Sequence, residues 1–146
     1  MTEREAAQEA AHWSHFPHDA DIGVRGCGPS VESAFEQAAL ALSAIVTDEA
    51  IEPKERVVVH CEAPEMDLLF VEWLNAIVYE MAVRKMLFGR FKVRIAAATL
   101  EGEAFGEKVD VARHQPSVEP KGATYTALRV GQDPDGLWRA ECVVDV

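Results

Sequence analysis

With 146 residues, of which 49% are hydrophobic, the chain is long and apolar enough for one domain with its own core. Its 25 acidic residues against 14 Lys and Arg give a net charge of −11, which disfavours direct, tight binding to nucleic-acid phosphates. No apolar run approaches the roughly 20 residues that a bilayer span requires, so no membrane attachment is expected.

The N-terminal segment and the cysteines bear on the cellular compartment. Residues 1–12 are polar and rich in alanine, without the basic and then apolar order of a signal peptide, and are predicted to form a disordered or frayed tail. Residues 13–146 are predicted to form the single domain. Cys27, Cys61 and Cys142 form no C-x-x-C pair, so we expect buried thiols rather than disulfides or a zinc site. Together these features predict a cytoplasmic protein.

The first half of the chain predicts strands separated by a helix. Extended segments are expected at residues 13–16 and 22–26. Ser30 is a suitable N-cap for a helix that ends near Thr47–Asp48, because apolar residues follow Ser30 at helical spacing. The β-rich residues 56–61 then predict a strand.

The second half predicts one more helix and then strands. Around residues 64–67 a proline and two acids favour a helix start, and a broad apolar stripe follows. Turns are expected at Gly102–Glu103 and at Asp133–Gly136. Further strands are predicted at residues 91–95, 124–130 and 137–146. This order of elements favours an α+β fold in which two helices pack on a mostly antiparallel or mixed β-sheet.

Two acidic segments raise the question of a metal site. Asp19 and Asp21 precede a predicted strand, and Asp145 lies beside Val146, where the sequence ends. If the first and last strands are neighbours, Asp21, Asp145 and the main-chain oxygens of Val146 converge. An all-oxygen cluster suits a hard divalent cation such as Ca²⁺ or Mg²⁺. The residues alone leave open the alternative that these are solvated strand ends.

The five histidines do not predict a metal site. His12, His15 and His18 are spaced three apart, but the proline before the last of them disfavours a helix. In an extended chain the three side chains would point in alternating directions, which argues against a transition-metal site. His60 and His114 are isolated in the sequence and carry no signal.

The sequence offers no enzyme site of its own. It contains neither a G-x-S-x-G nucleophile elbow nor a Walker-type glycine loop. A metal-dependent hydrolase that uses Asp19, Asp21 and Asp145 to activate water is a rival interpretation. No general base or substrate pocket is evident in the sequence to support it.

Several segments, taken in order, resemble the archease family, the small protein partners of the RtcB-type RNA-splicing ligase. They are HDADIGVRGCG, SVESAFEQAALALSAIVTD, DLLFVEWLNAIVYE, FGEKVDVARH, EPKGATYTALRV and WRAECVVDV. The resemblance covers residues 16–146, and the ordered set is more specific than any single piece. It implies a compact α+β fold.

The resemblance also implies a divalent-ion site. In the family this site is built from the aspartate of an H-T-A-D motif and the last two residues, which here are Asp21, Asp145 and Val146. Ca²⁺ is the expected ion, with Mg²⁺ or Mn²⁺ as alternatives. His18 matches the motif histidine and is expected to orient Asp21 or contact the partner, or else to pack at a corner. Asp19 replaces the usual threonine and adds a negative charge.

A lysine is implied as well. Lys121 matches the lysine of the family's K-A-x-T-Y stretch, and at an acidic site it would hold a phosphate or pair with a carboxylate, unless it is simply solvated. Pro120 and Gly122 flank it where the family has a β-branched residue and an alanine. Proline removes a backbone donor and glycine loosens the strand at this position.

The activity that the resemblance implies is assistance rather than catalysis. Such a protein would promote guanylylation and multiple turnover of an RtcB-type RNA ligase, in tRNA splicing or RNA repair. The alternative is a chaperone-like modulator of nucleic-acid methyltransferases. The oligomeric state is not predicted.

Overall fold

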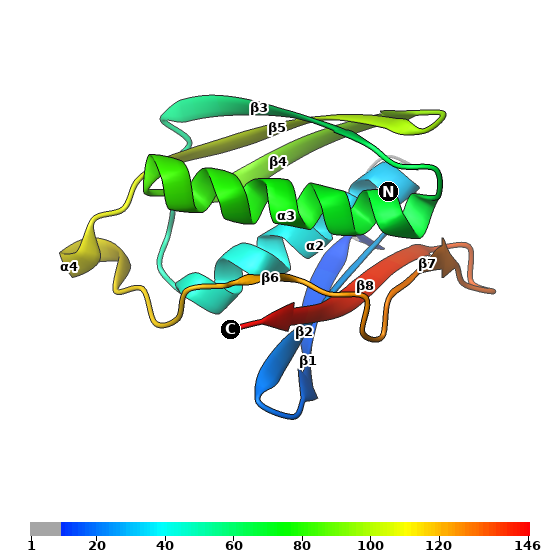
Figure 1. Cartoon of the computed structure of the whole chain (residues 1–146), viewed down its shortest axis with the longest axis horizontal. Coiled ribbons are helices and arrows are strands. Elements are labelled where there is room, and N and C mark those ends of the chain that lie inside the picture. The colour runs from blue at the N-terminus through cyan, green and yellow to red at the C-terminus, as the bar shows by residue number, and fades with distance from the viewer. Residues whose placement is uncertain (1–9) are drawn as a thin grey trace.

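The protein is described by a computed structural model over residues 10–146. It contains, in chain order, β1 (His12–His18), β2 (Asp21–Gly28), α2 (Val31–Val46), β3 (Glu55–Glu62), α3 (Met66–Arg84), β4 (Met86–Ala96), β5 (Thr99–Lys108), α4 (Val111–His114), β6 (Gly122–Ala123), β7 (Arg129–Gln132) and β8 (Trp138–Asp145) (Figure 1). The α+β class is confirmed. Most of the predicted tail, residues 1–9, lies outside the described residues, and β1 begins at His12.

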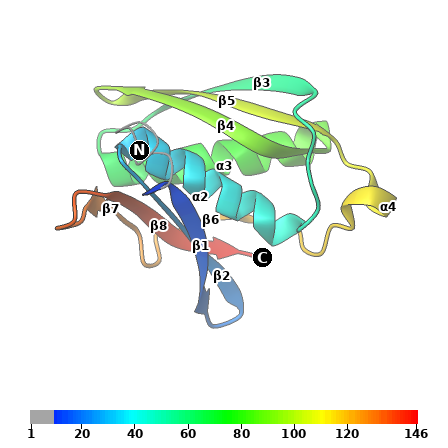
Figure 2. The same ribbon diagram turned by 180° about the vertical axis from the view of Figure 1, so that it is seen from behind.

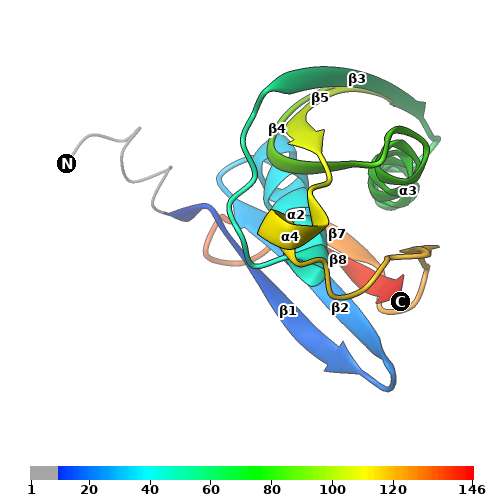
Figure 3. The ribbon, with the colours of Figure 1, turned by 90° about the vertical axis from the view of Figure 1, so that its left-hand side faces the viewer.

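The strands form two sheets, where the element order suggested one. The larger sheet has the order β1-β2-β8-β6, with β7 also pairing with β8, and the smaller sheet has the order β3-β5-β4. Every strand pairing among residues 10–146 is antiparallel. Figure 3 shows α2 between the two sheets, with α3 alongside it under the curve of the smaller sheet. The β1–β2 turn projects at the bottom of the reverse view (Figure 2).

Helix α2 packs closely on β2 because the residues at their contact have small side chains or none. Its predicted start is confirmed, since the Ser30 hydroxyl accepts a hydrogen bond from the Ser33 N–H at 3.1 Å. Ala34 and Ala38 are fully buried against Gly26 of β2. A Cβ at Gly26 would lie 2.0 Å from the Ala34 oxygen, so only glycine permits this approach. The helix ends at Val46 with Thr47 as its C-cap, at the predicted place.

Helix α3 is anchored by Trp73, which is fully buried. Its indole N–H donates to the Phe35 oxygen of α2 at 3.0 Å. Its ring lies over Gly102 of β5, where a Cβ would come within 2.2 Å of the indole. The predicted turn at Gly102–Glu103 is therefore wrong, because this glycine makes room for an aromatic ring inside a strand. The turn lies at residues 97–98 instead, with Ala97 at a φ of 54°.

The predicted strand over residues 124–130 is wrong for residues 124–128 and right only for its last two, Arg129 and Val130, which begin β7. The chain makes the two-residue strand β6, then a turn with Ala127 at a φ of 54°, and then β7. The turn is held on β8 because the Val143 N–H donates to the Thr126 oxygen at 3.0 Å. The following hairpin is confirmed: β7 and β8 pair across a turn closed by the Gly136 N–H and the Asp133 oxygen.

The three thiols are free and buried, as predicted. Burial raises the pKa of Cys61 to about 11 and that of Cys142 to about 12, which keeps both protonated and unreactive near neutral pH. Within residues 10–146, no helix combines the length and the apolar character that crossing a membrane demands.

Candidate functional site

Pairing of β2 with β8 brings Asp21 to the end of the chain. Ile22 lies opposite Val144, and continuing this antiparallel register by one step sets Asp21 opposite Asp145. Residues directly opposite each other share one face of a sheet. The Val146 N–H donates to the Asp21 Oδ1 at 3.2 Å. In Figures 1 and 2 the end of β8 lies beside β2. Asp21, Asp145 and Val146 thus occupy one edge, which we call the acidic edge.

The acidic edge faces solvent and carries two carboxylates. Asp21 is half-buried and Asp145 is exposed. Among residues 10–146, neither carboxylate has an ion-pair partner. Two neighbouring carboxylates repel each other unless a positive charge or water intervenes. Two such carboxylates could hold a cation.

The donor set at this edge fits a hard divalent ion. No three His, Cys, Asp or Glu side chains within the described part of the chain gather where they could hold a metal ion. An ion here would therefore need the main-chain oxygens of Val146 besides the carboxylates of Asp21 and Asp145. Such a set contains oxygen only, which is the chemistry that Ca²⁺, Mg²⁺ and Mn²⁺ prefer.

Strand β6 brings Lys121 to the same edge. Gly122 lies opposite Asp145 in the β6–β8 pair, and the main-chain N–H of Lys121 donates to the main-chain oxygen of Asp145 at 2.8 Å. The next step of the register sets the exposed Lys121 opposite Val146. Neither the proline before Lys121 nor the glycine after it prevents this bond.

The position of β6 depends on a residue that sequence reasoning missed. The Asn75 Oδ1 of α3 accepts a hydrogen bond from the Ala123 N–H at 2.8 Å. This contact ties β6 to α3. An asparagine inside the apolar stripe of the predicted helix was the available signal, since a polar group on a buried face needs a partner.

His18 and Asp19 differ in their relation to the acidic edge. His18 lies opposite Asp21 in the β1–β2 pair, so the two residues share a face. Asp19 sits in the turn with a φ of 52° and its side chain is 94% exposed, so it faces water. The predicted alternation along β1 is confirmed, because the His15 Nε2 instead hydrogen-bonds the Ala41 oxygen of α2 at 2.7 Å.

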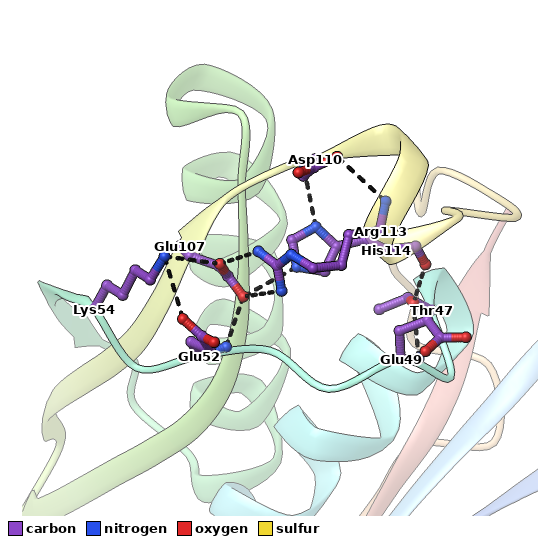
Figure 4. Close-up of polar contacts among 8 residues, drawn as sticks. All are labelled: Thr47, Glu49, Glu52, Lys54, Glu107, Asp110, Arg113 and His114. Atoms are coloured by element: carbon purple, nitrogen blue, oxygen red, sulfur yellow. Dashed lines mark hydrogen bonds and ion pairs between the residues drawn. The ribbon is translucent and has the colours of Figure 1, made fainter.

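A second polar cluster surrounds Glu107, which is buried together with His114 while its other partners reach the surface (Figure 4). The Glu107 side chain accepts hydrogen bonds from the Arg113 guanidinium, the Glu52 N–H and the His114 ring. Arg113 above all, and then the Glu52 N–H, hold the pKa of Glu107 at about 2. The His114 Nδ1 accepts a hydrogen bond from the Asp110 N–H at 2.9 Å. The ring proton is therefore on Nε2, which donates a hydrogen bond to the Glu107 carboxylate.

This cluster fixes the segment that leads to Lys121. We call residues 109–121 the strap. Besides the Arg113–Glu107 pair, the Thr47 hydroxyl donates to the His114 oxygen, and the Ser117 N–H donates to the Val46 oxygen at 2.8 Å. His114 is fully buried although its sequence context gave no signal. The cluster therefore holds the strap against α2 and β5.

Known proteins are similar to this chain in sequence and in fold. The model of the Archease protein family matches residues 13–146. Protein archease of Pyrococcus furiosus is 38% identical over 139 residues, covering 92% of this chain and 98% of that protein. Protein archease of Sulfolobus acidocaldarius is 36% identical over 134 residues, covering 90% and 96% respectively. The solution structure of Methanobacterium thermoautotrophicum protein 1598 is similar with a TM-score of 0.80 and 29% identity, covering 92% of this chain and 98% of that one.

Proposed function

Because this chain belongs to the archease family, we propose that it is a non-catalytic protein cofactor of an RtcB-type RNA ligase. It acts in the cytoplasm, in tRNA splicing or RNA repair, by promoting guanylylation and repeated turnover of the ligase. The observation that carries the proposal is the acidic edge, where Asp21, Asp145 and Val146 meet beside Lys121.

The chemistry of the acidic edge suits a nucleotidyl-transfer partner. Asp21, Asp145 and the main-chain oxygens of Val146 would hold a divalent ion, Ca²⁺ first, with Mg²⁺ or Mn²⁺ as alternatives. When bound, such an ion neutralises charge on phosphoryl oxygens. The Val146 N–H orients the Asp21 carboxylate, and Lys121 offers a cation for a phosphate oxygen at the same edge. The net charge of −11 would steer the protein toward the basic cleft of an enzyme that binds RNA.

Metal binding is the first test. Calorimetric titration with Ca²⁺ should show at least about tenfold weaker binding for Asp21→Asn and for Asp145→Asn, because each variant removes one of few charged ligands. Two control variants remove a charge elsewhere: Asp19→Asn in the solvent-exposed turn and Glu62→Gln on β3. Both should retain the wild-type affinity within about twofold. Equal affinity in all five proteins would exclude the acidic edge as the metal site.

Stimulation of the ligase is the second test. The wild-type protein should increase the fraction of cognate ligase guanylylated with GTP and the number of RNA ends joined per enzyme. Asp21→Asn combined with Asp145→Asn should abolish most of this increase, whereas Glu62→Gln should not. No stimulation by the wild type would refute the proposal. Robust phosphoester hydrolysis by the purified protein alone would favour the hydrolase, and stable capture of a methyltransferase but not the ligase would favour a modulator.

A further inference from the structure

A large apolar groove lies outside the acidic edge. It has a volume of about 530 Å³ and runs between the C-terminal half of α3 and the strap. Val78 and Met81 line it from α3, and Val111, Val118 and Pro120 line it from the strap. Val111 is 71% exposed and Val118 is 39% exposed, although both are aliphatic. Clustered exposed apolar side chains of this kind are typical of interaction sites.

The groove and the acidic edge are connected by two consecutive residues of the chain. Pro120 lines the groove. The next residue, Lys121, donates its main-chain N–H to the main-chain oxygen of Asp145 in the acidic edge. In Figure 1 the chain runs from α4 to β6, and β6 pairs with the end of β8. The groove therefore begins next to the acidic edge, within reach of a protein that covers that edge.

Two opposite charges stand in the groove wall. Lys85, at the C-terminal end of α3, and Glu119, in the strap, both line it and are both exposed. Within the described residues neither has an ion-pair partner. A complementary occupant presents apolar side chains between an acidic and a basic residue. Charge pairs at the rim of an interface set register and specificity.

We propose that this groove is the docking site for an apolar segment of the ligase, flanked by one acidic and one basic residue. The inference rests on the proposed function and adds a second anchor to it. The strap is already fixed by the Arg113–Glu107 pair and by the Ser117–Val46 hydrogen bond. The groove is thus preformed, so that docking requires little ordering of this chain.

Charged substitutions in the groove test the proposal without threatening the fold. Val111→Glu and Val118→Glu place a carboxylate on exposed positions and should weaken binding to the purified ligase at least about tenfold, because they bring a charge into an apolar contact. Lys85→Glu should weaken it as well by reversing a rim charge. The matched control is Val58→Glu, a valine that is 53% exposed on β3. It should bind like the wild type, and all four variants should keep the wild-type Ca²⁺ affinity.

The outcomes separate this inference from the proposed function. Wild-type binding by Val111→Glu and Val118→Glu, while the Asp21 and Asp145 variants still lose stimulation, would overturn only the docking site. A wild-type protein that neither binds nor stimulates the ligase would refute the function first, and the docking site with it.

A cross-linking experiment identifies the occupant. Because the three native thiols are buried, Val118→Cys can be labelled selectively with a benzophenone maleimide. Irradiation with the ligase should attach the label to a ligase segment of the stated composition, and Val58→Cys should give no such product. A cross-link to a second copy of this chain, or to the ligase from both positions alike, would overturn the proposal.

Discussion

Glu107 is the carboxylate that the fold pairs most completely. It is 3% exposed, and its oxygens accept hydrogen bonds from Arg113, from the Glu52 N–H and from His114. These donors all favour the ionised form, and burial alone would have favoured the neutral one. Protonating Glu107 would leave the Arg113 guanidinium without its partner and would loosen the strap.

The paired state of Glu107 predicts a specific loss of stability in acid. Its pKa is about 2 in the folded protein, mainly because of Arg113, against about 4.3 for a glutamate in an unfolded chain. The stabilisation is therefore complete above about pH 4.3 and is lost as the pH falls toward 2. Glu107→Gln should be less stable than the wild type at pH 7, and the difference between them should shrink across this window.

Urea unfolding at several pH values measures this difference. The control is Glu62→Gln, which removes an exposed carboxylate whose polar contact within residues 10–146 is with the His60 ring at 3.3 Å. Its difference from the wild type should stay small throughout. A Glu107→Gln curve parallel to the wild-type curve from pH 5 to pH 2 would contradict the assigned role.

Single residues also show how far sequence reasoning reached. The meeting of Asp21 and Val146 could be anticipated, because it required only that the strand after Asp21, which is β2 rather than the first strand β1, lie beside the last strand. Asn75 and His114 could not be assigned. Their partners lie across the fold, as in the Asn75–Ala123 contact between residues 48 apart: a polar residue in an apolar stripe signals that a partner is needed, but no local pattern identifies it. The metal role of the acidic edge stays a prediction.

At the scale of elements, the two wrong predictions of secondary structure, a turn at Gly102–Glu103 and a strand through residues 124–128, have a common physical cause. Gly102 and residues 124–130 were assigned from local preference, which takes glycine as a turn signal and β-branched residues as a strand signal. In the fold, Gly102 makes room for Trp73. The end of β8 is shared by β6 and the turn before β7, which interrupts the expected strand. Tertiary contacts outweighed local preference at both places.

The contact of α2 with β2 predicts that Gly26 tolerates no side chain. Its Cβ would lie 2.0 Å from the Ala34 oxygen and 2.3 Å from the Ala38 nitrogen, and these backbone atoms can move only with the whole helix. Gly26→Ala should lower the free energy of unfolding by roughly 1–3 kcal/mol or more, as overpacked cores do. Chemical denaturation followed by circular dichroism measures the change.

Gly131→Ala is the matched control for Gly26. A Cβ at Gly131, in β7, would meet nothing within 4 Å. Because alanine restricts the unfolded chain more than glycine does, this variant should be neutral or slightly stabilising. Equal destabilisation by both substitutions would mean that the α2–β2 contact is not the tight one.

At the scale of the whole molecule, the two sheets are joined through α2. The Ser43 hydroxyl donates to the Phe88 oxygen of β4 at 2.5 Å, and the Glu36 carboxylate accepts from the Val93 N–H at 2.8 Å. The opposite side of the same helix packs on β2 of the larger sheet. Neither sheet can separate from α2 without exposing the core that they share.

This joint core predicts that both sheets unfold in one cooperative transition, as expected for the single domain predicted over residues 13–146. Of the three tryptophans, Trp73 lies against the smaller sheet, so Trp13→Phe combined with Trp138→Phe leaves a reporter for that part. Its fluorescence and the far-ultraviolet circular dichroism should share one urea midpoint. Amides in the centres of β2 and β5 should exchange with the same free energy of opening. Separate urea midpoints for fluorescence and circular dichroism would instead reveal two folding units that α2 fails to couple. The larger sheet, which carries the acidic edge on β2 and β8, could then unfold while the smaller sheet stays folded.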